Sequence, residues 1–233
     1  MADKSYGQFC PVAMAAEILC TRWTLLVVRE LVCGSRRFND LRRGVPRMSP
    51  ALLSKRLKEL EQAGIIRRAA APGNPIVLEY ELTDAGRELA PIVESIGHWG
   101  HRWVDSAISL ANLDPFLLMW DMRRRLDPTP LPQRRCVIQF LYPDQPPAQQ
   151  NFWLIVAPDE PVDLCASDPG FEVDLFVTTD LGTMTAIWMG LTTVARAREE
   201  DKLSVVGDAR LFGDMQSWLG LSVFARSREA TNA

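Results

Sequence analysis

The stretch MSPALLSKRLKELEQAGIIRR, residues 48–68, predicts a helix with two different faces. Ser49 is a favourable N-cap, Pro50 a favourable first helical residue and Gly64 a favourable stop. Leucines at positions i, i+4 and i+7 predict a buried stripe made of Leu53, Leu57 and Leu60. A surface helix needs this stripe, but it does not need the serines, lysines and arginines beside it. We therefore expect the other side of the helix to lie against a polyanion.

Charge is distributed unevenly along the 233 residues, whose net charge is −3. Residues 1–104 hold 15 Lys and Arg against 11 Asp and Glu, a balance of +4, whereas residues 105–233 hold 11 against 18, a balance of −7. Residues 22–68 alone carry 12 basic and 4 acidic side chains, a balance of +8. This switch favours two domains with different partners, of which the basic one suits phosphate.

The composition, 47% hydrophobic and 24% charged, is typical of a soluble protein with a buried core. The candidate membrane span, the apolar run at residues 181–195, is short and interrupted by Gly and Thr, so we expect that it does not cross a membrane. The chain does not open with a secretory signal, and its five Cys lack metal-type spacing. We expect a cytoplasmic protein with reduced thiols, no membrane partner and no cofactor.

The residues before the opening stretch predict three helices. The first opens at Pro11, the second ends at Gly34, and a short third lies between Ser35 and Pro46. Their apolar positions are expected to face inward: Val12, Ala16, Leu19, Leu25, Val28, Leu31, Val32, Phe38 and Leu41.

After Gly64 the apolar period changes to two. IIRRAAA and IVLEYELT, joined by a turn at residues 72–75, predict a β-hairpin. Two helices, a short helix, a basic helix and a hairpin, in this order, predict a winged helix-turn-helix. In such a domain one helix enters the major groove of DNA.

A further helix is predicted from about residue 83 to beyond Trp103. Its apolar residues are spaced 3, 4, 3 and 4 apart, which is a heptad-like seam: Leu89, Ile92, Ile96, Trp99 and Trp103. A seam of this length with two Trp favours a dimer interface. The alternative, packing against its own domain, stays open on these residues alone.

Polar and basic side chains off the leucine stripe are candidate DNA contacts. On the basic helix they are Ser49, Pro50, Ala51, Ser54, Lys55 and Lys58, with Arg56 near the edge of the stripe. Around it lie Arg36, Arg37, Arg42, Arg43, Arg67, Arg68, Gly73 and Asn74. A solvated basic face is the alternative. The full order of elements and the balance of +8 favour DNA.

Several phrases resemble the HxlR family of bacterial winged-helix regulators. They include RWTLLVVREL, RRFNDLRR, SPALLSKRLKELEQAGII and LTDAGRELAPI, within residues 9–103. The resemblance implies a homodimer, joined through the first and last helices of the domain, that binds a roughly palindromic operator. Many members carry a basic residue where this chain has Ala51, so the resemblance implies one charged contact fewer here.

Cys10 precedes Pro11 at a predicted helix N-terminus, where the helix dipole makes a thiol more reactive. Some relatives in the family use a Cys here to sense oxidants or electrophiles, so the resemblance implies a redox-sensing role as one interpretation. The other is a small hydrophobe at a dimer contact. Cys20 and Cys33 lie in apolar runs and are expected in the core.

The two histidines, His98 and His101, share a helical face with Glu94 and Asp105. Such a face can bind zinc, but a solvated polar face has the same pattern, and we expect no metal. No Ser/His/Asp set and no Gly-rich phosphate loop is present in the sequence, so we expect no enzyme.

The second half predicts an α+β domain. DPTPLPQ, residues 127–133, resembles a linker, and short strands bounded by Pro, Asp or Gly follow it, then helices. The predicted domains are residues 1–110 for the winged helix, 111–133 for the linker, 134–225 for the α+β domain and 226–233 for a tail.

The helix TMTAIWMGLTTVA is apolar nearly all round, which fits either an internal cavity or an ordinary core. VDLFVTTDLGTMTAIWMG and DKLSVVGDARLFGDMQSWLGLS resemble the sterol-carrier-protein-like fold. That resemblance implies a hydrophobic tunnel for an apolar ligand. The candidate lining residues are Phe140, Trp153, Phe171, Trp188, Met189 and Trp218.

Together these features predict a homodimeric DNA-binding transcriptional regulator with a C-terminal sensor of a small hydrophobic ligand. Regulation through Cys10, with the second domain as a scaffold, is the alternative. A lipid-handling protein is a third class, and no catalytic residues are visible for it.

Overall fold

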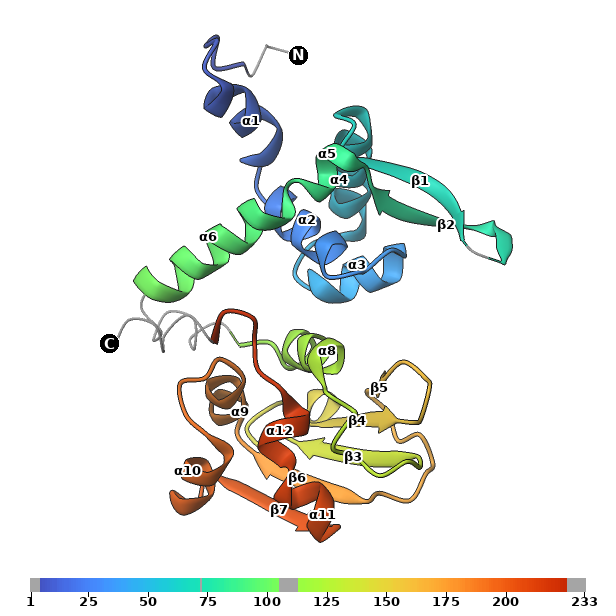
Figure 1. Ribbon diagram of the computed structural model, residues 1–233, viewed down its shortest axis with the longest axis vertical. Helices are drawn as coiled ribbons and strands as arrows, with labels where there is room; N and C mark the ends of the chain where they lie inside the picture. Colours follow the sequence, from blue (N-terminus) through green and yellow to red (C-terminus); the bar gives the residue numbers. More distant parts are fainter. Residues whose placement is uncertain (1–4, 72, 105–112, 226–233) are drawn as a thin grey trace. The chain divides into compact units, whose positions relative to one another are not determined.

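The computed structural model describes residues 5–71, 73–104 and 113–225, which divide between two compact units, Met1–Gly97 and His98–Ala233 (Figure 1). The first unit begins with α1 (Pro11–Leu19), α2 (Thr24–Val32), α3 (Phe38–Gly44) and α4 (Pro50–Gln62). The hairpin β1 (Ile66–Ala71) and β2 (Asn74–Leu82) follows, then α5 (Asp84–Arg87) and α6 (Ala90–Trp103), and the boundary between the two units falls within α6, after Gly97. The predicted winged helix-turn-helix is confirmed.

Helices α2, α3 and α4 share one hydrophobic core with the base of the hairpin. The leucine stripe lies in this core as predicted, because Leu53, Leu57 and Leu60 are almost fully buried. Val27, Val28, Leu31 and Leu41 pack from the two preceding helices. The stripe therefore fixes which side of α4 remains in solvent.

Helix α1 differs from its prediction. None of its residues is buried within the described chain, and Val12 is exposed although it was expected to face inward. Leu19, at the end of the helix, packs partly against the core. Since α1 meets its own domain mainly at that end, the rest of its apolar side has no partner among the described residues.

The long last helix of the first domain is interrupted. Helix α5 ends at Arg87, two residues form a turn, and α6 begins at Ala90. Gly86 packs so closely against the Ile65 carbonyl that a Cβ there would clash, which ties this turn to the hairpin base. The helix α6 then continues through the predicted seam.

The second unit contains a five-stranded sheet of order β5-β4-β3-β6-β7. Its strands are β3 (Cys136–Leu141), β4 (Asn151–Val156), β5 (Asp163–Cys165), β6 (Leu175–Thr179) and β7 (Leu203–Gly207). β3 and β6 pair in parallel and the other neighbours are antiparallel. The helical elements are α8 (Pro115–Arg125), the 3-10 turn η1 (Pro147–Gln149), α9 (Leu181–Trp188), α10 (Val194–Glu199), α11 (Ala209–Gly213) and α12 (Met215–Leu219).

Helices α8 to α12 pack on one face of the sheet. Alternate strand residues such as Ile138, Phe152 and Val177 form a single core with buried residues from each helix. The other face carries Phe176 and Val206, which are exposed. This arrangement confirms the predicted α+β class.

The linker prediction for residues 111–133 is wrong at residues 115–125. These residues form α8, whose Leu118, Met119 and Met122 are buried in the core of the second unit. Asp114 caps the helix by accepting a hydrogen bond from the Leu117 amide at 3.1 Å. Residues 105–112 and 226–233, which include the first part of the predicted linker and the tail, lie outside the described residues.

No single described helix is long and apolar enough to cross a membrane. Helices α1 and α2 pass such a test only when taken together, and they are bent by 85° at the break between them.

Candidate nucleic-acid interface

Helix α4 is held in place by a cap at its N-terminus and by the leucines on its buried side. Ser49 accepts a hydrogen bond from the Leu52 amide at 3.3 Å, which is the predicted N-cap, and Pro50 occupies the first turn. The buried leucines hold the opposite side in the core. The predicted contact residues on this helix are consequently exposed: Ser49, Pro50, Ala51, Ser54, Lys55 and Lys58.

The basic candidates fall into two groups. Side chains of the first group have no ion-pair or hydrogen-bond partner among the described residues, and they are Arg42, Lys55 and Lys58. In the second group, each arginine pairs with a carboxylate: Arg36 with Glu81, Arg37 with Glu79, Arg43 with Asp40, Arg67 with Glu81 and Arg68 with Glu61. Glu79 is buried beside Arg37, whereas the other four pairs are more exposed and therefore weak, so phosphate can displace their carboxylates.

Arg56 belongs to the domain interior rather than to the exposed side. Its side chain is 12% exposed, and it donates to the Arg22 carbonyl at 3.2 Å while pairing with Glu59. Arg56 therefore joins α4 to the segment between α1 and α2. Because its donors are already bound to the Arg22 carbonyl and to Glu59, this position favours a structural role for Arg56 over the predicted DNA contact.

A buried polar network joins the ends of α2 and α3. Glu30 is fully buried, pairs with Arg29 at 2.5 Å and accepts a hydrogen bond from Ser35 at 3.1 Å. Arg29 also donates to the Gly44 carbonyl at 3.0 Å. The network therefore holds the end of α3 against α2, and both helices precede α4 in the chain.

The hairpin is joined to the residues that precede α3. The Tyr80 amide donates to the Arg36 carbonyl at 2.8 Å, and Arg37 donates to Glu79 at 3.0 Å. At the other end, Asn74 accepts a hydrogen bond from the Ile76 amide at 3.1 Å, so the predicted contact Asn74 also stabilises the turn. Gly73, in the same turn, adopts a positive φ of 76°.

The predicted dimer seam lies largely in solvent. Trp99 is 62% exposed and Trp103 is 69% exposed, and Ile92 and Ile96 are about half exposed. Leu89 differs, because it precedes α6 and is buried in the core of its own domain. The side chain of Leu89 is thus accounted for without a second chain, whereas the other four are not.

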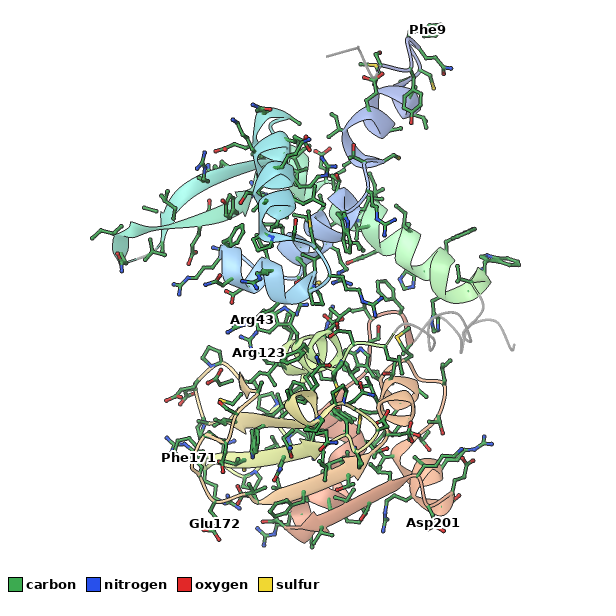
Figure 2. All side chains as sticks on the ribbon, turned by 180° about the vertical axis from the view of Figure 1, so that it is seen from behind. Phe9, Arg43, Arg123, Phe171, Glu172 and Asp201 are labelled. Atoms are coloured by element: carbon green, nitrogen blue, oxygen red, sulfur yellow. The ribbon has the colours of Figure 1, made fainter. Side chains whose placement is uncertain are left out.

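Cys10 is the N-cap residue of α1 and is exposed, as are Cys20 and Cys33. The expectation that Cys20 and Cys33 are core residues is wrong, because both lie at helix ends on the outside. Phe9 beside Cys10 points away from the domain at the tip of the N-terminal segment (Figure 2). All five cysteines are free thiols.

The predicted polar face of α6 forms no metal site within the described residues. No group of three His, Cys, Asp or Glu side chains in residues 5–71, 73–104 and 113–225 is arranged to hold a metal ion. Asp105, one member of the predicted face, lies outside the described residues.

A hollow of about 430 Å³ lies between the end of α1 and the second half of α4. Glu17, Ile18 and Thr21 line one side, and Arg56 and Glu59 line the other. Its lining mixes apolar side chains with charges of both signs. No sequence pattern indicated it, since its two walls are separated by more than thirty residues.

The six predicted ligand-lining residues do not all meet. Phe140, Trp188 and Trp218 lie in the core of the second unit with Met189 packed against it. Trp153 alternates with the core residues Phe152 and Leu154, so it lies on the opposite face of the sheet.

Phe171 is also outside this core. It lies at the periphery of the unit, and its ring is 4.6 Å from the Arg135 guanidinium (Figure 2). Trp153 and Phe171 therefore do not share the core that holds the other four candidates, and the role of all six in ligand binding stays a prediction.

Two further features of the core bear on ligand binding. Met119, Met122, Met184 and Met215 are all fully buried in it. The Tyr142 hydroxyl is also fully buried and donates to the Met119 sulfur at 3.1 Å. A thioether is a weak acceptor, and burial raises the pKa of Tyr142 well above its ordinary value of 10.0.

Sequence comparison matches the first unit to proteins of known class. A model of the HxlR-like helix-turn-helix family matches residues 18–108. The uncharacterized HTH-type transcriptional regulator YvaP of Bacillus subtilis is 42% identical over 100 residues, which are 42% of this chain and 93% of YvaP. The HTH-type transcriptional regulator YodB of Bacillus subtilis is 32% identical over 41% of this chain and 87% of its own length. Among solved structures, the redox regulator HypR in its reduced form is 33% identical, with a TM-score of 0.39, over 43% of this chain and 99% of that one.

Proposed function

Because the chain belongs to the HxlR-like helix-turn-helix family, we propose that it is a DNA-binding transcriptional regulator that acts as a homodimer. One observation carries the proposal. Helix α4 buries its leucines and leaves Lys55 and Lys58 exposed, without partners among the described residues, beside Ser49 and Ser54. An unpaired lysine can neutralise a phosphate without first breaking an ion pair.

In this proposal the first turns of α4 enter the major groove. Ser49 and Ser54 are short enough to reach base edges or phosphates there, while Lys55 and Lys58 contact phosphates. The paired arginines at the start of α3 and at the hairpin base exchange carboxylate for phosphate. Ala51, on the same exposed side of the helix, supplies no charge.

The exposed seam of α6 and the unpartnered apolar side of α1 support the homodimer. Ile92, Ile96, Trp99 and Trp103 place a large apolar surface in solvent on a helix, which is unusual for a monomer. Two copies present two α4 helices, and half-sites about 34 Å apart match one turn of DNA.

Binding selection from random duplex DNA tests the function. We expect enrichment of a two-fold symmetric sequence by the full-length protein. The slope of log affinity against log salt should fall in magnitude by about 0.9 for each phosphate contact removed in Lys55→Ala or Lys58→Ala. Arg56→Ala serves as the control for a basic residue inside the domain, and it should leave the slope unchanged. Failure to enrich any sequence contradicts the proposal.

We further propose that the second unit, whose sequence resembles the sterol-carrier-protein-like fold, binds a small hydrophobic effector that alters operator affinity. Its four buried methionines support this, because flexible thioether side chains repack around different apolar shapes. An effector with an oxygen atom offers the Tyr142 hydroxyl a better acceptor than the Met119 sulfur. A ligand that prefers one dimer geometry changes the spacing of the two α4 helices.

Native mass spectrometry of freshly purified protein tests the effector. We expect a dimer carrying an additional small mass that is lost on denaturation. Removal of that molecule and its return should change operator affinity in opposite directions. Unchanged affinity in protein shown to be fully loaded contradicts the effector proposal while leaving DNA binding intact.

Redox control through Cys10 is the second candidate, because Cys10 is exposed at the first turn of α1. In this case oxidation or alkylation of the thiol alters the dimer through α1 and releases DNA. The critical variant is Cys10→Ser. If that variant still releases DNA on treatment with oxidant, Cys10 is not the sensor.

A further inference from the structure

The two edges of the sheet in the second unit differ. Strand β5, at one edge, has only three residues and begins with a charge, Asp163. Strand β7, at the other edge, is LSVVG, residues 203–207, without a charge or a proline and without a break in its pairing with β6. Figure 1 shows β7 at the outer margin of its unit. Edge strands of soluble proteins are usually short, charged or bulged, because their free backbone groups can pair with another chain. Strand β7 lacks these protections.

The backbone groups that β7 directs away from the sheet follow from one hydrogen bond. The Asp208 amide donates to the Asp174 carbonyl at 2.9 Å. Backbone groups alternate in direction along a strand, so Val206 also bonds toward β6, whereas Val205 directs its amide and carbonyl outward. In the described part of the chain no element lies beyond β7 in the sheet to bond them. The centre of the edge therefore offers one donor and one acceptor to a further strand.

The charges that flank β7 are complementary to those of a second, antiparallel β7. If two copies pair with Val205 opposite Val205, Lys202 of each copy lies opposite Asp208 of the other. Opposite charges at such positions favour pairing, and the ion pairs that both residues form within their own chain are solvent-exposed and weak. A shift of two residues would instead place Glu200 opposite Asp208, or Lys202 opposite Arg210. Like charges oppose both shifts, so the charges select the pairing centred on Val205.

The side chains on both faces of the sheet also suit this pairing. On the outer face Val206 is 64% exposed beside Phe176, which is 45% exposed. In the centred pairing Val206 lies opposite Ser204 of the second copy, which covers one side of it. On the helix side the two Val205 side chains meet, and each also packs against the core of its own unit. Neither face thus buries a charge at the contact.

We propose that β7 pairs in antiparallel fashion with β7 of a second copy of this chain, centred on Val205, and joins the two five-stranded sheets into one. The inference rests on the proposed homodimer, because a pair of five-residue strands is too weak to hold two chains by itself. The α6 seam brings the strands together at high effective concentration. Both contacts share one two-fold axis, since two separate axes would link chains into an open filament. Because Val205 packs against the core proposed to hold the effector, the pairing connects the two effector sites of the dimer.

Disulfide formation between two different variants tests the pairing and its register. Ser204→Cys and Val206→Cys chains of the full-length protein, carrying tags of different mass, are co-expressed and treated with a mild oxidant. The non-buried cysteines are first replaced by serine: Cys10, Cys20, Cys33 and Cys165. Residues 204 and 206 of opposite copies would form a pair without hydrogen bonds, whose Cα atoms lie about 4.5 Å apart, within reach of a disulfide. We expect the mixed disulfide to form at least about tenfold faster than a disulfide in either variant alone, which are the matched controls.

The charges are tested in the same assay. Lys202→Glu, added to both chains, should slow the mixed disulfide about fivefold, because it places two acidic residues opposite each other on each side of the axis. Arg125→Glu makes the same change of charge at an exposed site of the same unit and should leave the rate unchanged. Equal rates for the two substitutions overturn the register selected by charge.

The remaining outcomes separate this inference from the proposed function. A faster disulfide in Ser204→Cys alone, or in Val206→Cys alone, overturns the centred register. No disulfide in any mixture, in protein that is dimeric by sedimentation velocity, overturns the pairing but leaves the α6 dimer and DNA binding standing. Covalent species larger than a dimer overturn the shared axis. A protein that is monomeric without oxidant instead defeats the proposed homodimer, and this inference with it.

Discussion

The Glu30 carboxylate fills the space that a side chain at Gly44 would need. A Cβ placed at Gly44 would meet the carboxylate and the Cγ of Glu30, which is fully buried and bound by Arg29 and Ser35. Gly44 is therefore required by a charge network and not by a turn. The relation joins two helices that determine how α4 is presented.

Gly44→Ala should lower the free energy of unfolding of the first unit by about 1–3 kcal/mol, because the methyl group displaces a buried carboxylate from its partners. Gly100→Ala is the control. Gly100 lies in α6, and a Cβ there would have no neighbouring atom within 4 Å, so this substitution should be neutral or slightly stabilising. Urea unfolding followed by tryptophan fluorescence measures both. Equal effects of the two substitutions would contradict the argument.

Two substitutions at Ser49 separate helix capping from DNA contact. Ser49→Ala removes the acceptor for the Leu52 amide and should cost about 1 kcal/mol of stability. Ser49→Asp keeps a good cap, so stability should be retained, but its charge repels phosphate and should weaken operator binding at least about tenfold. Thermal unfolding measures the stability of each variant, and fluorescence anisotropy titrations measure its affinity for the operator. Full binding by Ser49→Asp would place Ser49 away from DNA.

Trp99→Glu should dissociate the proposed dimer. Trp99 is exposed in the single chain, so the substitution should leave the fold of the protomer unchanged, while a charge in the seam opposes association. We expect the dissociation constant to rise by about 30-fold or more, measured by sedimentation velocity. Ile76→Glu, at an exposed site in the hairpin, provides the control. A stable dimer of the Trp99→Glu variant would exclude the α6 seam as the dimer interface.

Cys136 should be the slowest thiol to react with iodoacetamide. It is buried, and desolvation raises its pKa above the ordinary value of 9.0, so little thiolate is present at pH 8. The exposed Cys20 should react more than about tenfold faster. Urea should remove the difference, as peptide mass spectrometry would record. Comparable rates in the native protein would contradict the buried position.

Asp208 should contribute to the loss of stability of the second unit in acid. Its backbone hydrogen bond from Arg210, with a smaller contribution from the charge of Arg134, lowers its pKa below the ordinary 3.8. The folded state therefore favours the carboxylate, and this stabilisation is present above pH 3.8 and is lost as the pH falls through the lower folded pKa.

Asp208→Asn removes the titrating group while keeping a cap. It should show a smaller loss of stability than the wild type between about pH 4 and pH 2. Thermal unfolding across that range measures the difference. An unchanged pH profile would show that Asp208 is not one of the groups responsible.

The first unit was largely predictable because its signals are local. Ser49, Pro50 and the leucine spacing specify α4 without reference to other elements, and the change of period after Gly64 specifies the hairpin. The inward side of α1 was predicted wrongly, because periodicity indicates an apolar face and does not say whether it packs within the chain.

The second unit was predictable in class but not in detail. Helix α8 was missed because the linker indicated by DPTPLPQ was extended back to residue 111, although Asp114 and Pro115 are good start signals. The separation of Trp153 from the other lining candidates was not predicted, because strand alternation places Phe152 and Trp153 on opposite faces of the sheet and the sequence does not say which of them faces the helices. Residue type alone does not contain that information.

The parallel pairing of β3 with β6 has a consequence for the order of folding. Ile138 lies opposite Leu175, so the centre of the sheet closes only after the intervening chain is made, and β7 is later still. The β1–β2 hairpin instead pairs strands separated by a short turn. Contacts between distant residues form slowly, and domains emerge from the ribosome in order. The first unit should therefore reach its native structure during synthesis, before the sheet of the second unit is complete.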